Sequence, residues 1–67
     1  MSNNKLREIR VDKGLSQLQL SILTEITPQA ISNIENNKVY VYPGWKKRVA
    51  EALQVPEEEI FPDESEV

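Results

Sequence analysis

The sequence predicts a compact all-α domain built from five short helices. Its 67 residues suffice for one small domain, near the lower size limit for a chain that folds unaided. Two helix starts stand close together: Ser16 is followed by Gln19 in a capping-box pattern, and Thr27 is followed by Pro28. Apolar residues recur at helical spacing on both sides of these starts. Helices joined by short turns are therefore expected along almost the whole chain.

The first expected helix covers residues 5–13 and carries Leu6 and Ile9 on one side. Gly14 should end it, because glycine adopts the left-handed conformation that closes many helices without strain. Arg10 lies one turn beyond Leu6 on the same side. A charge at a core-facing position needs a partner, so Arg10 is expected to be paired.

Two helices joined by a tight turn are expected over residues 16–36. The first begins at Ser16, and the second begins at Thr27 and ends near Asn36, which leaves only residues 24–26 for the turn. Three apolar residues of the first helix and the turn are expected to anchor the pair in the core: Leu20, Leu23 and Ile26.

The second helix of this pair has an apolar side and a polar side at about 100° per residue. Ala30, Ile31 and Ile34 lie on the core side. Gln or Asn can bond bidentately to adenine in the major groove, and Ser can serve several bases. The opposite side is suited to reading base edges, with a merely solvated face as the alternative, because it carries only amides and a hydroxyl: Gln29, Ser32, Asn33 and Asn36.

A resemblance to the phage-repressor-type (lambda-repressor-like, XRE) helix-turn-helix family appears in residues 15–38, LSQLQLSILTEITPQAISNIENNK. It also covers LREIR near the N-terminus and VAEALQVPEEEIF, which ends at Phe61. The resemblance implies a five-helix lambda-repressor-like fold with the helix-turn-helix motif at about 16–36. The motif residues that match are Gln17, Leu20, Ser21, Ile26, Ile31, Ile34, Glu35 and Asn36.

The resemblance further implies that the helix at about 28–36 lies in the major groove of double-stranded DNA. Gln29 and Asn33 are then expected to specify bases, with help from Ser32 and Thr27. The N-terminal amides of the preceding helix should hold phosphates. Three further side chains are expected to hold phosphates and to fix the register of the protein on the duplex: Gln17, Asn36 and Lys38.

Family members pair an arginine of the first helix with the glutamate that ends the recognition helix, and both are present here as Arg10 and Glu35. Two unrelated surface charges are the alternative. The turn departs from the family pattern, because Thr24 replaces a residue that is often aliphatic and Glu25 replaces a glycine. A left-handed conformation at Glu25 would cost on the order of 1 kcal/mol, so the turn is either strained or slightly different.

Residues 39–44 are expected to form an extended loop, since a single strand would find no partner in a helical domain. Tyr40 and Tyr42 in this loop are expected to pack onto the core. A stacking platform for nucleic acid is the alternative, although such platforms are usually surrounded by a basic groove.

A fourth helix is expected over about 44–53, because Trp45, Val49, Ala52 and Leu53 form an apolar stripe. Its first turn is basic, which phosphate contact and simple solubility explain equally well, and consists of Lys46, Lys47 and Arg48.

A short fifth helix is expected from Val55 to Phe61, with Pro56 at its first helical position. The predicted domain therefore covers residues 1–61. Residues 62–67 are expected to form an acidic flexible tail.

Charge is distributed unevenly along the chain. All eight Lys and Arg and four of the acidic residues fall within residues 1–50, for a net charge of +4, whereas seven acidic residues fall within residues 51–67. The overall net charge of −3 thus hides a basic region that could approach DNA. The acidic end is either a solvated tail or a segment that lowers non-specific affinity for DNA.

The chain contains no Cys and no His. A zinc site and the common nucleophile and base constellations therefore lack their usual residues, and we expect no enzyme activity, no metal and no cofactor. Nothing resembles a signal peptide or a membrane span, so a cytoplasmic location is expected.

These patterns predict a small transcriptional regulator, a repressor, that binds DNA sequence-specifically. One recognition helix reads only a few base pairs, so a homodimer on a two-fold symmetric operator is expected. The dimer surface is expected at Ile60 and Phe61, unless those residues close the core. The alternative function is a protein-interaction module, for example an antitoxin that binds a protein partner and also represses its own gene.

Overall fold

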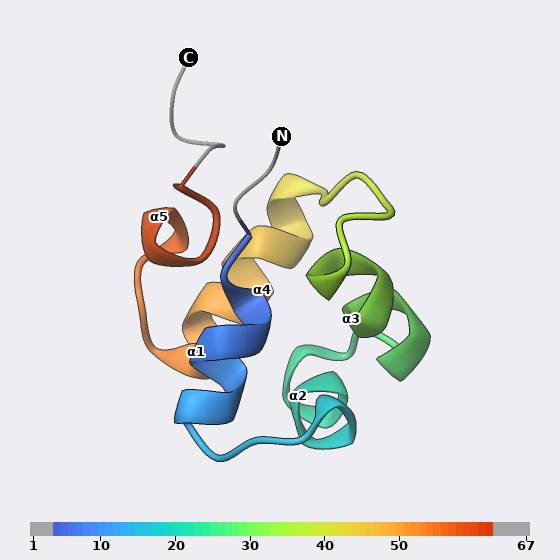
Figure 1. The fold of residues 1–67 in the computed structure, drawn as a ribbon, viewed down its shortest axis with the longest axis vertical. Helices are drawn as coiled ribbons and strands as arrows, with labels where there is room; N and C mark the ends of the chain where they lie inside the picture. The colour runs from blue at the N-terminus through green and yellow to red at the C-terminus, as the bar shows by residue number, and fades with distance from the viewer. Residues whose placement is uncertain (1–3, 63–67) are drawn as a thin grey trace.

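The computed structural model describes residues 4–62, which form five helices and no strand (Figure 1). This confirms the predicted all-α class. The helices are α1 (Leu6–Asp12), α2 (Gln17–Thr24), α3 (Pro28–Glu35), α4 (Pro43–Leu53) and α5 (Glu57–Ile60). Most of the expected tail, residues 63–67, lies outside the described part of the chain. No helix of the described part has the length and apolarity needed to cross a membrane.

One hydrophobic core joins all five helices. α2 packs against α3 and α4, α4 packs against α5, and α1 packs against α3 (Figure 1). Burial of apolar side chains is the main favourable contribution to folding a domain of this size. The fully buried side chains come from every helix: Leu6, Leu20, Ile31, Ile34, Val49, Leu53 and Ile60.

The helix starts of the central motif follow the predicted capping chemistry. The Ser16 hydroxyl accepts a hydrogen bond from the Gln19 backbone N–H at 3.0 Å, and the Gln19 side chain accepts one from the Ser16 backbone N–H at 2.8 Å. The Thr27 hydroxyl accepts from the Ala30 backbone N–H at 3.2 Å. Gly14, with φ of 77°, ends the first helix in the left-handed conformation as expected.

The turn between α2 and α3 keeps the left-handed geometry although glycine is absent. Glu25 has φ of 60°, so it carries the strain that the sequence indicated. The buried hydroxyl of Thr24 donates to the Leu20 carbonyl at 2.8 Å and accepts from the Ile26 N–H at 3.3 Å. These bonds satisfy a polar group that would otherwise be costly to bury.

The prediction that Leu23 anchors the motif is wrong. Leu23 is 57% exposed, whereas Thr24 is only 2% exposed. Leu20 and Thr24, four residues apart, share the side of α2 that faces the core. Leu23 lies on the solvent-exposed side of the same helix. The hydroxyl of Thr24 tolerates burial because it bonds to the backbone of its own helix.

The expected packing of the loop tyrosines onto the core is also wrong. Tyr40 and Tyr42 are 66% and 57% exposed, and only Val41 and Trp45 of this region pack against the core. The loop begins after Asn37, which takes the left-handed conformation with φ of 58°.

The expected dimer surface at Ile60 and Phe61 is contradicted by burial. The two residues are 0% and 3% exposed, and the Ile60 carbonyl accepts a hydrogen bond from the Lys5 N–H at 2.8 Å. A chain this small needs the apolar residues of α5 to close its core.

Pro56 precedes α5 as its N-cap and does not occupy its first helical position, in contrast to the prediction.

A buried carboxylate joins α1, α2 and α3. Arg10 Nε lies 2.6 Å from Glu35 Oε2, and both Arg7 Nε at 3.3 Å and Gln17 Nε2 at 3.0 Å donate to Glu35 Oε1. The Glu35 side chain is 0% exposed and that of Arg10 is 11% exposed. Arg10 also donates to the Leu15 carbonyl at 2.7 Å. The buried Glu35 carboxylate can stay ionised because charged and neutral hydrogen-bond donors surround it.

Replacing Glu35 by Ala should lower the free energy of unfolding by about 3 kcal/mol, because the change strands the Arg10 charge. Replacing both residues by apolar ones of similar size should cost less than the single change. Urea unfolding of the two single variants and the double variant measures the coupling, and Glu51→Ala, which removes an exposed carboxylate, should have little effect. Independent effects of the two changes would show that the pair is not coupled.

Acid should weaken the same network. Burial raises the pKa of Glu35, but hydrogen bonds from Arg10 and Gln17 and the Arg10 charge hold it below its ordinary value of 4.5. The Glu35 carboxylate therefore binds a proton less readily in the folded state than in the unfolded state. The ionised carboxylate stabilises the fold fully above the unfolded-state pKa of Glu35, and this stabilisation is lost as the pH falls through the folded-state pKa. We expect the stability difference between wild type and Glu35→Gln to be largest near about pH 7 and to shrink below about pH 4. A difference that stays constant with pH would contradict this.

Candidate nucleic-acid interface

The outward side of α3 presents two amides that bond to each other. Gln29 is exposed and Asn33 is half-buried, and Gln29 Nε2 donates to Asn33 Oδ1 at 3.3 Å. Within residues 4–62 no other hydrogen bond engages Gln29 Oε1 or Asn33 Nδ2. The pair therefore offers one free acceptor and one free donor group, side by side on one helix face.

The C-terminal end of the same face is tied to α1. Asn36 Oδ1 accepts from Arg7 Nη2 at 2.7 Å, and Asn36 Nδ2 donates to the Ser32 carbonyl at 3.0 Å. Asn36 Nδ2 also lies 3.4 Å from the Ser32 hydroxyl oxygen. Ser32, predicted to help in reading bases, and Asn36, predicted to hold a phosphate, are thus engaged within the protein. A phosphate at Asn36 would have to replace one of these bonds.

Arg7 lies beside the predicted site residues, although its sequence pattern did not single it out. Its side chain is 56% exposed and contacts both Glu35 and Asn36, so it places a cation beside the end of α3. The available signal was its spacing: Arg7 and Arg10 lie three residues apart and therefore share one face of α1.

Gln17 and Thr27 have structural contacts in addition to their predicted roles. Gln17 opens α2 and is half-buried, and its Nε2 is bonded to Glu35. Thr27 uses its hydroxyl oxygen to cap α3, which leaves the hydroxyl proton available to a further acceptor.

Lys38 follows α3 and is exposed. Its backbone N–H donates to the Asn33 carbonyl at 2.9 Å, which fixes the chain just beyond the helix end. The Lys38 side chain forms no ion pair within the described range of residues 4–62. Its charge is therefore available to an anion at this end of α3.

The basic residues near the start of α4, Lys46, Lys47 and Arg48, were explained equally well by phosphate contact and by solubility, but two of them have contacts within the domain. Arg48 Nη1 donates to the Thr24 carbonyl at 3.4 Å, at the C-terminal end of α2, where a cation is favourable. Lys46 Nζ lies 5.8 Å from the centre of the Phe61 ring, within the range of a cation–π interaction. Two of these three cations thus have contacts within the domain.

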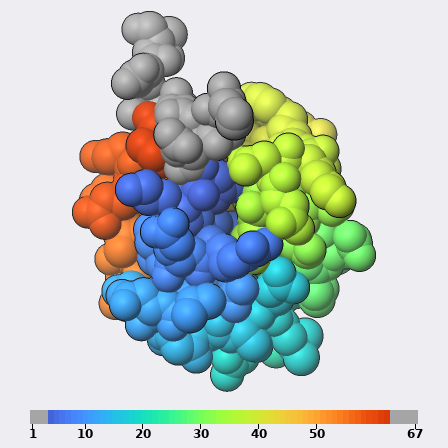
Figure 2. Space-filling view, in the orientation of Figure 1, coloured from blue at the N-terminus to red at the C-terminus, as the bar shows by residue number. Residues whose placement is uncertain are grey.

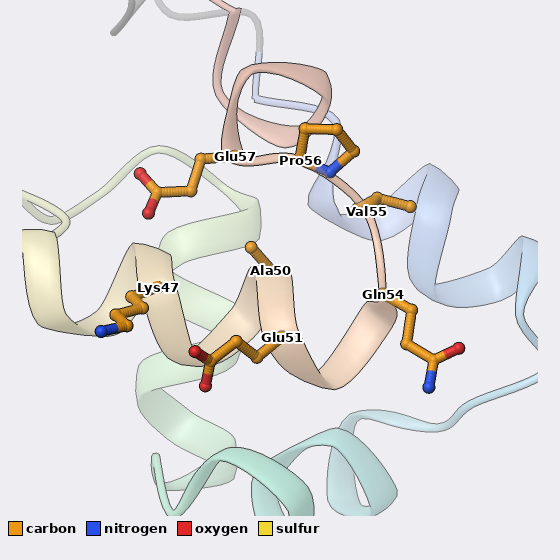
Figure 3. Close-up of a pocket in the computed structure, with 7 residues that line it drawn as sticks. All are labelled: Lys47, Ala50, Glu51, Gln54, Val55, Pro56 and Glu57. Carbon is orange, nitrogen blue, oxygen red and sulfur yellow. The ribbon is translucent and has the colours of Figure 1, made fainter.

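An open pocket of about 390 Å³ lies between the C-terminal half of α4 and the start of α5 (Figure 3). Its lining includes Lys47, Glu51 and Glu57 and none of the predicted site residues. The amide pair of α3 and this pocket are therefore separate features. Residues 4–62 also hold no cluster of three or more potential metal-ligating side chains.

The protein-family model described as a helix-turn-helix domain matches residues 3–66. Among solved structures, the chain is similar to the restriction-modification controller protein C.AhdI from Aeromonas hydrophila, with a TM-score of 0.81 and 32% sequence identity over 85% of this chain and 86% of that one. It is also similar to the clp gene regulator ClgR from C. glutamicum, with a TM-score of 0.77 and 25% identity over 82% of this chain and 71% of that one. No curated protein sequence matches the chain. The chain therefore belongs to the helix-turn-helix family, as a DNA-binding protein of the lambda-repressor-like (XRE) type.

Proposed function

We propose that this protein is a transcriptional repressor that reads the major groove of double-stranded DNA with α3. The observation that carries the proposal is the amide pair of Gln29 and Asn33, which leaves one acceptor and one donor group free on an exposed helix face. Adenine presents the complementary donor and acceptor in the major groove. Similarity to the controller C.AhdI and the regulator ClgR supports a regulatory role.

Phosphate contacts would hold α3 in the groove. Lys38 at the C-terminal end of α3 and Arg7 beside Asn36 supply charge, and the first backbone N–H groups of α2 supply neutral donors. Gln17, at the same end of α2, could use the second hydrogen of its amide group. Local placement of these groups compensates for the negative net charge of the whole chain.

Binding as a homodimer to a two-fold operator is part of the proposal, because one copy of α3 spans only a few base pairs. Burial of Ile60 and Phe61 removes them as the dimer surface. Large exposed apolar side chains remain on α2 and in the loop before α4, and either group could support association.

One observation favours a second candidate function, binding to a protein partner. The outer side of α2 exposes Leu18, Ile22 and Leu23 at 61%, 69% and 57%, which is a large apolar surface for so short a helix. An antitoxin that also represses its own gene would combine both functions. A gel shift with genomic DNA fragments at low and moderate salt separates specific DNA binding from its absence.

Replacing Gln29 or Asn33 by Ala should lower affinity for the preferred operator by about 1 to 3 kcal/mol and relax the preference at one base pair of each half-site. Stability should hold, because Ala is a better helix former than either amide. The measurement is selection of DNA fragments by the purified protein, followed by titration of the selected site and of an unrelated duplex. A reporter gene behind the selected site should be expressed less when the protein is present. Unchanged operator preference in both folded variants would exclude α3 as the reading element and favour the protein-partner function.

Lys38→Ala should weaken binding to all duplexes alike and reduce the slope of log affinity against log salt by about one unit, because one phosphate contact is lost. Lys47→Ala is the matched control, since Lys47 is an exposed lysine at the pocket between α4 and α5. Equal slopes for both variants and wild type would remove Lys38 from the interface.

A further inference from the structure

Three aromatic rings form a ladder that runs from the loop after α3 to the first turn of α4. The rings of Tyr40 and Tyr42 are 5.4 Å apart at an interplanar angle of 81°, and those of Tyr42 and Trp45 are 5.2 Å apart at 84°. Trp45 packs against the hydrophobic core, whereas Tyr40 at the other end is 66% exposed. The ladder thus connects the core to an exposed phenol.

The ladder positions the Tyr40 side chain before any ligand binds. Edge-to-face contacts of this kind stabilise aromatic pairs beyond the area that they bury. A side chain that is already held loses less conformational freedom on binding. The Tyr40 hydroxyl has no hydrogen-bond partner among residues 4–62, so its donor is free to reach an external acceptor.

The position of the loop relative to α3 indicates which acceptor that is. The Asn37 N–H donates to the Ile34 carbonyl at 3.1 Å, and the Lys38 N–H donates to the Asn33 carbonyl, so the loop starts directly on the end of α3. Figure 2 shows the loop, in yellow-green, meeting the green surface of α3 along one side of the molecule. The eight residues of α3 span about 12 Å, close to the width of the major groove, so a chain leaving the end of a helix in the groove meets the sugar–phosphate backbone.

An exposed cation precedes the segment that carries Tyr40. Val41 turns to the core, while Tyr40 and Tyr42 point outward with their rings in contact. Lys38, two residues before Tyr40, is exposed just beyond the end of α3. Residues 39–45 carry no charge, so nothing in this segment repels a phosphate.

We propose that the Tyr40 hydroxyl donates a hydrogen bond to a DNA phosphate next to the groove that α3 reads, and that Tyr42 and Trp45 act as positioning residues for it. This inference rests on the proposed DNA-binding function. It adds a neutral phosphate contact to the charged one expected from Lys38. A neutral donor releases no counterion of its own, so its loss changes affinity without changing the salt dependence.

The test compares wild type with Tyr40→Phe, which removes only the hydroxyl and keeps the ring ladder. We expect affinity for the selected operator and for unrelated duplex to fall by the same factor, about three- to tenfold. The salt slope should stay at the wild-type value, in contrast to Lys38→Ala. Tyr42→Phe is the matched control and should bind as wild type, because Tyr42 contributes its ring and not its hydroxyl. Tyr42→Ala should weaken binding, since it removes the middle ring that holds Tyr40.

Three results would overturn the inference. Unchanged affinity of Tyr40→Phe, with lost operator binding in Gln29→Ala, would remove Tyr40 from the interface and leave the proposed function standing. A changed monomer–dimer equilibrium of Tyr40→Phe without DNA, measured by sedimentation, would assign the hydroxyl to an interface between two copies of the chain. Absence of DNA binding by the wild-type protein would overturn the inference together with the proposed function. Thermal unfolding of each variant verifies that the compared proteins are folded.

Discussion

The orientation of α3 depends on the buried carboxylate of Glu35. An ionised group without access to water is tolerated only where donors surround it, and here the donors come from Arg10 and Arg7 on α1 and from Gln17 on α2. Hydrophobic packing alone permits small rotations of one helix against another, whereas hydrogen bonds to a single carboxylate are directional. The network therefore adds a directional constraint to the core that α3 already shares with its neighbours.

Local signals explain how much of the fold was predictable from the sequence. Capping by Ser16 and Thr27 and the left-handed turn at Gly14 each depend only on residues within one helical turn. A short stretch of sequence is therefore enough to predict them. The periodicity of the helix that begins at Pro43 is a cause of the same kind. These elements are correct to within one or two residues.

Features that depend on tertiary contacts were not predictable in the same way. Leu23 and Thr24 lie three and four residues after Leu20, so helical spacing alone can place either residue in the core. The apolar residue, Leu23, was predicted to be buried, but the buried residue is Thr24. Ile60 could close a core or form an interface, and the difference depends on how much apolar surface the other helices supply. The contacts of Arg7 with Asn36 and of Arg48 with Thr24 join segments that are distant in sequence.

Hydrogen bonds divide the polar face of α3 into two pairs of residues. Asn36 and Ser32 are bonded to each other, and Arg7 connects Asn36 to α1, so a change at Asn36 alters the support of the helix as well as its surface. The side chains of Gln29 and Asn33 form hydrogen bonds only with each other within residues 4–62. Because this pair is separate from the supporting network, its residues can change with little effect on folding, whereas the Glu35 end is constrained by three helices. Different sequence preferences can therefore arise on this scaffold by substitution of Gln29 and Asn33.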